Sequence, residues 1–106
     1  MTTMKIVRVT YTTKEEYAEH NKQNIAAVMA ELRTIGNPGV NYNCCLSPDG
    51  KTFTHLAFFD SEESEQVLLT LPIFKTFQQE LKASGPEAPP KQEVLGLVGS
   101  SKEFFL

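Results

Sequence analysis

A Pro-Asp-Gly turn in the middle of the chain, within residues 47–51, is the feature that most restricts the fold. Strand-like runs flank it, residues 40–46 before the turn and residues 52–59 after it. A short turn between two such runs is typical of a β-hairpin. Because the strands of a hairpin pair antiparallel, the sequence predicts an antiparallel sheet that grows outward from the centre of the chain.

The segment before the hairpin combines a strand pattern with a helix pattern. Residues 5–12 alternate with the period of a half-buried strand, with Val7, Val9 and Tyr11 on one side. Thr13 and Glu16 match a capping box, which predicts the start of a helix. The apolar stripe of this helix consists of Tyr17, Ile25, Val28, Leu32 and Ile35, and Gly36 would end it.

The segment after the hairpin shows the same two patterns in the opposite order. A second helical region carries Val67, Leu71, Phe74, Phe77 and Leu81. Pro72 should divide it into pieces of about 62–70 and 72–83, because proline disrupts helical hydrogen bonding. Residues 84–90 have linker composition, and residues 91–99 contain the expected last strand.

The predicted order is therefore βαββαβ, an α+β ferredoxin-like fold. Its four-stranded antiparallel sheet would carry the helices on one face. The length of 106 residues suits a single domain, and we expect one domain over residues 1–106.

The composition restricts the partners and the compartment. Ten basic and 13 acidic residues give a formal charge of −3 without a basic stripe, so nucleic acid is not expected. No membrane span or secretory signal is apparent, and the adjacent Cys44 and Cys45 are poorly placed to pair with each other. We therefore expect a cytoplasmic protein without a membrane partner. No metal or cofactor motif is present, so neither is expected.

The register of the hairpin determines which side chains share a face. Pairing Cys44 with Thr54 sets Tyr42 opposite Leu56 and Val40 opposite Phe58, which predicts an apolar face toward the helices. The other face would then hold Asn41, Asn43, Cys45, Phe53, His55, Ala57 and Phe59, with Ile6, Arg8 and Thr10 from the first strand. A half-apolar surface of this kind marks an interaction site. We expect a homodimer whose sheets enclose a small-molecule pocket.

His55 is the candidate catalytic residue, because imidazole titrates near neutrality and Asn43 opposite could hold its tautomer. The candidate ligand-binding residues are Asn41, Asn43, Arg8, Phe53 and Phe59. In the alternative interpretation His55 is a satisfied interface histidine, Arg8 pairs with an acid across the dimer interface, and the two phenylalanines form interface core. Cys45 and His55 are too few for a zinc site. The short apolar tail of residues 102–106 could fray or dock on a partner.

Two short segments carry a resemblance to a known family. In residues 58–63, Phe-Phe-Asp-Ser-Glu-Glu, a strand leads straight into a capped helix, and residues 71–77 read Leu-Pro-Ile-Phe-Lys-Thr-Phe. The chain thus resembles the dimeric α/β-barrel superfamily and is similar to antibiotic-biosynthesis monooxygenase-like proteins. The resemblance implies a homodimer with a pocket between sheet and helices or within the barrel.

The resemblance leaves two functions open. One is a homodimer that binds a small hydrophobic or aromatic ligand or is purely structural. The other is a cofactor-independent monooxygenase-like enzyme, or a lyase or isomerase, acting on a small aromatic or polyketide-like substrate. Proteins of the haem-degrading branch have a Trp and a His on the second helix, and this chain has neither. Haem chemistry is therefore not expected.

Overall fold

The computed structural model describes residues 4–105, and within them four strands form one antiparallel sheet in the order β2-β3-β1-β4. The elements are β1 (Lys5–Thr12), the short 3-10 helix η1 (Glu15–Tyr17), α1 (Ala18–Ile35), β2 (Val40–Leu46), β3 (Thr52–Phe59), α2 (Glu62–Leu69), α3 (Pro72–Ser84) and β4 (Ala88–Leu95). The predicted βαββαβ order and the ferredoxin-like α+β fold are confirmed.

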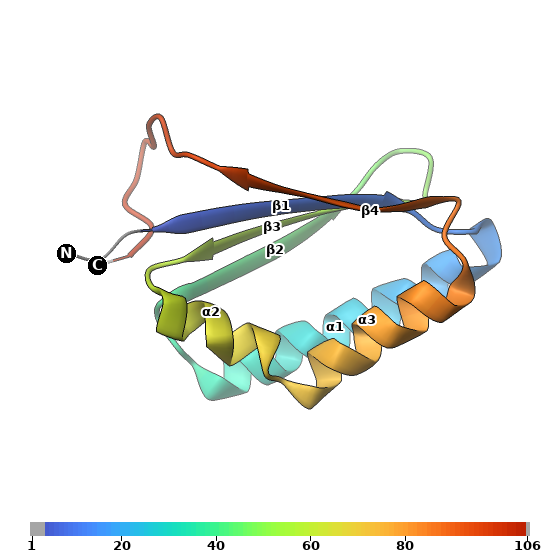
Figure 1. Ribbon diagram of the computed structural model, residues 1–106, viewed down its shortest axis with the longest axis horizontal. Coiled ribbons are helices and arrows are strands. Elements are labelled where there is room, and N and C mark those ends of the chain that lie inside the picture. The colour runs from blue at the N-terminus through green and yellow to red at the C-terminus, as the bar shows by residue number, and fades with distance from the viewer. Residues whose placement is uncertain (1–3, 106) are drawn as a thin grey trace.

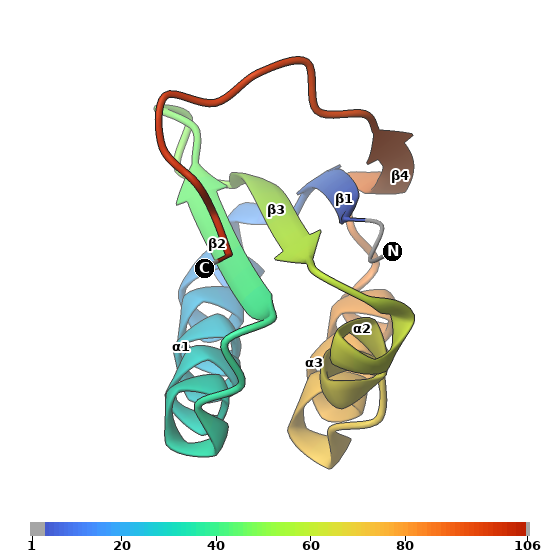
Figure 2. The ribbon, with the colours of Figure 1, turned by 90° about the vertical axis from the view of Figure 1, so that its left-hand side faces the viewer.

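The helices α1, α2 and α3 all lie on one side of the sheet (Figure 1). Seen from the end, α1 runs below β2, and α2 and α3 run beside it toward the β4 side (Figure 2). The opposite side of the sheet, which we call the open face, is crossed near one end by residues 96–105 (Figure 2). There Phe104 stacks on Phe58 with a centroid distance of 4.3 Å.

Local signals set the helix boundaries. The Ser61 hydroxyl accepts a hydrogen bond from the Ser64 amide at 3.1 Å and caps α2. Leu71 is extended, with φ −67° and ψ 125°, and Pro72 opens α3, so the predicted break is confirmed. Gly36, with φ 67°, ends α1.

Two predicted boundaries are wrong. Thr13 does not cap the first helix, because its amide and hydroxyl both donate to the Lys51 carbonyl, at 2.8 and 3.4 Å. The last strand, β4, begins at Ala88, within the predicted linker, and ends at Leu95. Pro89 and Pro90 fit there because β4 is an edge strand, which tolerates the loss of backbone donors.

The predicted hairpin register is wrong by one residue. Cys44 lies opposite His55 rather than Thr54, and Tyr42 lies opposite Ala57 rather than Leu56. The cause is the length of the hairpin turn, which has four residues, 48–51, where the predicted register implied three. The Ser47 amide donates to the Thr52 carbonyl at 2.9 Å, and Asp49 Oδ1 accepts the amides of Lys51 and Thr52, both at 2.9 Å.

A slip of one residue moves every side chain of a strand to the other face. Phe53, His55, Ala57 and Phe59 therefore point toward the helices and not to the open face. There they join a core contributed by all layers of the fold, with Val7 and Tyr11 from β1, Val28 from α1, Leu68 from α2, and Phe74, Phe77 and Leu81 from α3.

Among the described residues no helix is long and apolar enough to cross a bilayer.

Candidate functional site

A cavity of about 430 Å³ lies between the sheet and α3, and we call it the inner cavity. This volume is within the range of small-molecule sites. Val9 and three aromatic or imidazole side chains of the sheet form its floor, α3 forms one wall, and Pro86 with the first residues of β4 forms another. The lining residues are Val9, Tyr11, Tyr42, His55, Phe74, Phe77, Gln78, Leu81, Lys82, Pro86, Pro89 and Pro90.

A buried hydrogen-bond chain of four side chains, Asn21, Tyr11, His55 and Tyr42, reaches the floor of the inner cavity. Asn21 Nδ2 donates to Tyr11 Oη at 2.8 Å. Tyr11 Oη lies 2.7 Å from His55 Nε2, and Tyr42 Oη lies 2.6 Å from His55 Nδ1. Both ring nitrogens of the histidine are therefore bonded to phenol oxygens.

The strand register explains why these side chains meet. His55 on β3 is the direct neighbour of Val9 on β1 and of Cys44 on β2. Tyr11 and Tyr42 each lie two residues from those partners, which are the diagonal positions that long aromatic side chains can reach on the same face. One imidazole on the central strand β3 is thus held by one phenol from each neighbouring strand.

Burial keeps this chain of groups neutral. His55 is 3% exposed, and burial lowers the pKa of its imidazole to about 4. Burial also raises the pKa of the Tyr11 and Tyr42 phenols well above their ordinary value. At neutral pH the imidazole therefore carries one proton, and both phenols are protonated. The arrangement can hydrogen-bond a ligand, but it offers no charge of its own.

The predicted site residues do not form one cluster, because the sheet separates them. His55, Phe53 and Phe59 lie on the helix side, and Phe53 stacks on Tyr11 with a centroid distance of 5.6 Å. Phe53 and Phe59 are core residues that do not line the inner cavity, and Phe59 instead lines a neighbouring cavity of about 210 Å³ together with Tyr42 and His55.

The three polar candidates lie on the open face. Arg8 pairs with Glu93 of β4 at 2.5 Å, so its acidic partner comes from the same chain. Asn43 Nδ2 donates to Asn41 Oδ1 at 2.7 Å. The predicted contact between Asn43 and His55 is wrong, and its place is taken by the two tyrosines.

Sequence reasoning missed Asn21, Tyr11 and Tyr42 as site residues. Asn21 lies on the first helix outside its predicted apolar stripe, yet it is fully buried. The alternation of both strands already placed the two tyrosines on the helix side. A hairpin turn of four residues would have placed His55 between the two tyrosines. The length of that turn is therefore the sequence signal that could have identified them as site residues.

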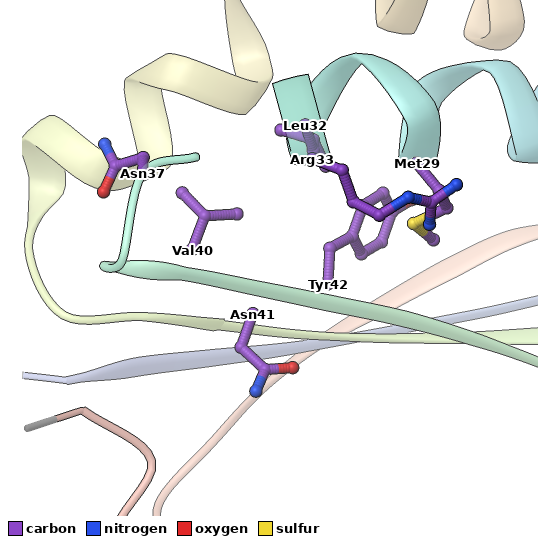
Figure 3. Close-up of a pocket in the computed structure, with 7 residues that line it drawn as sticks. All are labelled: Met29, Leu32, Arg33, Asn37, Val40, Asn41 and Tyr42. Carbon is purple, nitrogen blue, oxygen red and sulfur yellow. The ribbon is translucent and has the colours of Figure 1, made fainter. Parts of the chain in front are cut away.

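A smaller cavity of about 290 Å³, which we call the outer cavity, lies between the end of α1 and β2. Figure 3 shows Val40 and Tyr42 pointing from β2 toward α1, whereas Asn41 points away from it. Tyr42 lines both cavities. Among the described residues, no group of three His, Cys, Asp or Glu side chains is placed to hold a metal ion.

Comparisons with known proteins identify the fold. No protein-family profile and no curated protein sequence matches the chain. A solved Mycobacterium tuberculosis protein is similar over 94% of this chain and 100% of its own, with a TM-score of 0.78 at 13% identity. A structure from Caulobacter crescentus, described as a putative antibiotic biosynthesis monooxygenase, covers 92% of each chain, with a TM-score of 0.77 at 17% identity.

A third similar structure is SnoaB from Streptomyces nogalater, described as a cofactor-independent oxygenase. It matches 94% of this chain and 97% of its own, with a TM-score of 0.67 at 13% identity. Identities this low establish a common fold and not a common reaction. The chain has the ferredoxin-like fold of the antibiotic-biosynthesis-monooxygenase-like proteins, as its resemblance to them implied.

Proposed function

We propose that this protein binds a small, largely aromatic molecule in the inner cavity, with its polar end on Tyr42. The observation that carries the proposal is the cavity itself, about 430 Å³ with mainly apolar walls and a phenol–imidazole pair on its floor. Apolar walls favour an apolar body by removing its surface from water, and a few fixed polar groups orient it.

Adjacent glutamines on α3 give a matched test of this site. Both Gln78 and Gln79 are exposed, and Gln78 lines the inner cavity whereas Gln79 does not. We expect Gln78→Trp to weaken the binding of hydroxylated naphthalenes at least about tenfold, because the indole would occupy ligand volume. Gln79→Trp should bind like the wild type. Calorimetric titration measures both, and equal affinity of the two variants would place the ligand elsewhere.

A second candidate function is oxidation of such a molecule by O₂ without a metal or a flavin. The likeness to SnoaB, described as a cofactor-independent oxygenase, favours it. The one lone pair of a neutral His55 is bonded to a phenol, so a substrate proton would have to reach it through a tyrosine hydroxyl. However, a base with a pKa of about 4 is poorly matched to work near neutral pH, so we put binding first. Oxygen uptake with hydroxylated naphthalenes that is lost in His55→Gln would reverse this order.

We also propose that the protein is a homodimer that pairs through its open face. This face carries Leu56 of β3, with polar Asn41 and Asn43 along the β2 edge, whereas the Ile6–Phe58 pair near its end is already buried, with Phe104 stacked on Phe58. A single sheet with helices on one side leaves such a mixed surface for a partner. The free thiols of Cys44 and Cys45 support a reducing cytoplasm as the proposed compartment.

Leu56→Arg should convert the homodimer to a monomer, because a buried unpaired charge at the centre of the interface is costly. Leu69→Arg on α2 is the matched control, since Leu69 is 40% exposed and lies on the helix side. Sedimentation at micromolar concentration distinguishes the two states. A wild type that sediments as a monomer would remove the homodimer.

A further inference from the structure

Asn21 begins the buried hydrogen-bond chain with an amide that is itself incompletely paired. The residue is fully buried, its Nδ2 donates to Tyr11 Oη, and its Oδ1 is buried without a hydrogen-bond partner in the described structure. The reversed amide would leave the buried NH₂ group unpaired instead. Buried donors go unpaired less often than oxygen acceptors, so the observed orientation is the favoured one.

This orientation fixes the direction of the bonds that follow. Tyr11 Oη accepts a hydrogen bond from Asn21. Among the hydrogen bonds of residues 4–105, the acceptor available to the proton of the Tyr11 hydroxyl is His55 Nε2, at 2.7 Å. A neutral imidazole that accepts at Nε2 carries its proton on Nδ1. His55 Nδ1–H therefore donates to Tyr42 Oη, which lies 2.6 Å away.

The hydroxyl proton of Tyr42 is at the end of the hydrogen-bond chain. With its oxygen already accepting from His55, the Tyr42 hydroxyl has no acceptor among the hydrogen bonds found in residues 4–105. Tyr42 lines the inner cavity, where a ligand atom can accept this proton. Lys82 on the cavity wall adds a positive group that favours electron-rich oxygen.

We propose that Asn21 is a positioning residue that makes Tyr42 a hydrogen-bond donor to the inner cavity, which selects aromatic molecules bearing a carbonyl or anionic oxygen. The choice of ligand rests on the function proposed above, whereas the direction of the hydrogen bonds does not. Asn21 touches no ligand in this arrangement and acts through Tyr11 and His55.

The tautomer of His55 tests the direction without any ligand. We expect nitrogen NMR at pH 7 to find the wild-type imidazole protonated on Nδ1. Asn21→Asp should move the proton to Nε2, because a carboxylate accepts the Tyr11 proton and every bond of the chain then reverses. Asn43→Asp, on the open face, should leave the tautomer unchanged.

The wild-type spectrum decides the matter even if Asn21→Asp does not fold, since an Nε2–H tautomer in the wild type overturns the proposal. A folded Asn21→Asp protein that keeps Nδ1–H would also overturn it. Retention of the wild-type tautomer in Asn43→Asp, together with reversal in Asn21→Asp, supports the role of Asn21.

Two probes of equal shape test the selection of ligands. 2-Acetylnaphthalene carries a carbonyl oxygen where 2-isopropenylnaphthalene carries a CH₂ group. We expect the wild type to prefer the ketone about tenfold, the effect of one well-placed hydrogen bond. Tyr42→Phe should bind both probes equally.

Equal wild-type affinities for the ketone and the hydrocarbon would overturn the selection of ligands while leaving the binding site in place. Failure of both probes to bind would instead count against the proposed site. The tautomer of His55 then tests the direction of the hydrogen bonds separately.

Discussion

Replacement of Phe59 by alanine is expected to lower the free energy of unfolding by about 3–5 kcal/mol, the usual cost of removing a fully buried phenylalanine. Phe59 is 2% exposed and belongs to the core between the sheet and the helices, together with Val7 of β1 and Leu68 of α2. The lost contacts leave a cavity that the rigid sheet cannot fill. Urea unfolding followed by circular dichroism measures the change.

Phe104→Ala is the matched control for Phe59→Ala. Phe104 is only partly buried and stacks on Phe58 at the end of the open face, so its removal should cost about 1 kcal/mol or less. Sedimentation then separates a core role from an interface role. If Phe59→Ala instead kept its fold and dissociated a homodimer, Phe59 would belong to the open face, as the sequence-based register predicted.

The sequence predicted those parts of the fold that depend on local chemistry. Gly36 ends a helix because a left-handed residue is needed there, and Pro72 begins one because its ring fits the first turn. The alternation in residues 5–12 gave the correct faces of β1. Each of these signals acts within a few residues of where it is read.

The register failed because it depends on bonds that the sequence pattern does not display. Asp49 accepts two backbone amides and so closes the turn with one more residue than a Pro-Asp-Gly core suggests. Both registers gave β3 an apolar set, either Leu56 and Phe58 or Phe53 and Phe59, so hydrophobicity could not choose between them. The incorrect register therefore placed His55 on the open face instead of on the helix side.

The candidate site was predicted only in its central residue for the same reason. His55 stood out as a titratable side chain in a strand, but its partners were assigned by the wrong register. Asn21 was missed because an amphipathic stripe shows which side of a helix is buried without showing that a polar residue at its margin has a buried partner. The buried position of Asn21 can be recognised only when the position of its partner Tyr11 is known.

The stability of the protein is expected to fall by about 3 kcal/mol between pH 7 and pH 4 through His55 alone. Burial lowers the pKa of the folded imidazole to about 4, whereas the unfolded residue keeps its ordinary value of about 6.5. Between these values the unfolded chain binds a proton that the folded chain does not, so the free energy of unfolding rises with pH across this window.

His55→Gln should remove most of this dependence, because the amide can still bond to a phenol but does not titrate. His20→Gln is the matched control: His20 is exposed on α1 and bonded to Glu80 at 2.7 Å, a bond that glutamine can also make, and its replacement should change the slope much less than His55→Gln does. Urea unfolding at half-unit pH steps gives the slopes. A wild-type slope in His55→Gln would mean that His55 is not held neutral, and the phenols on either side of it would then face an imidazolium that donates to both.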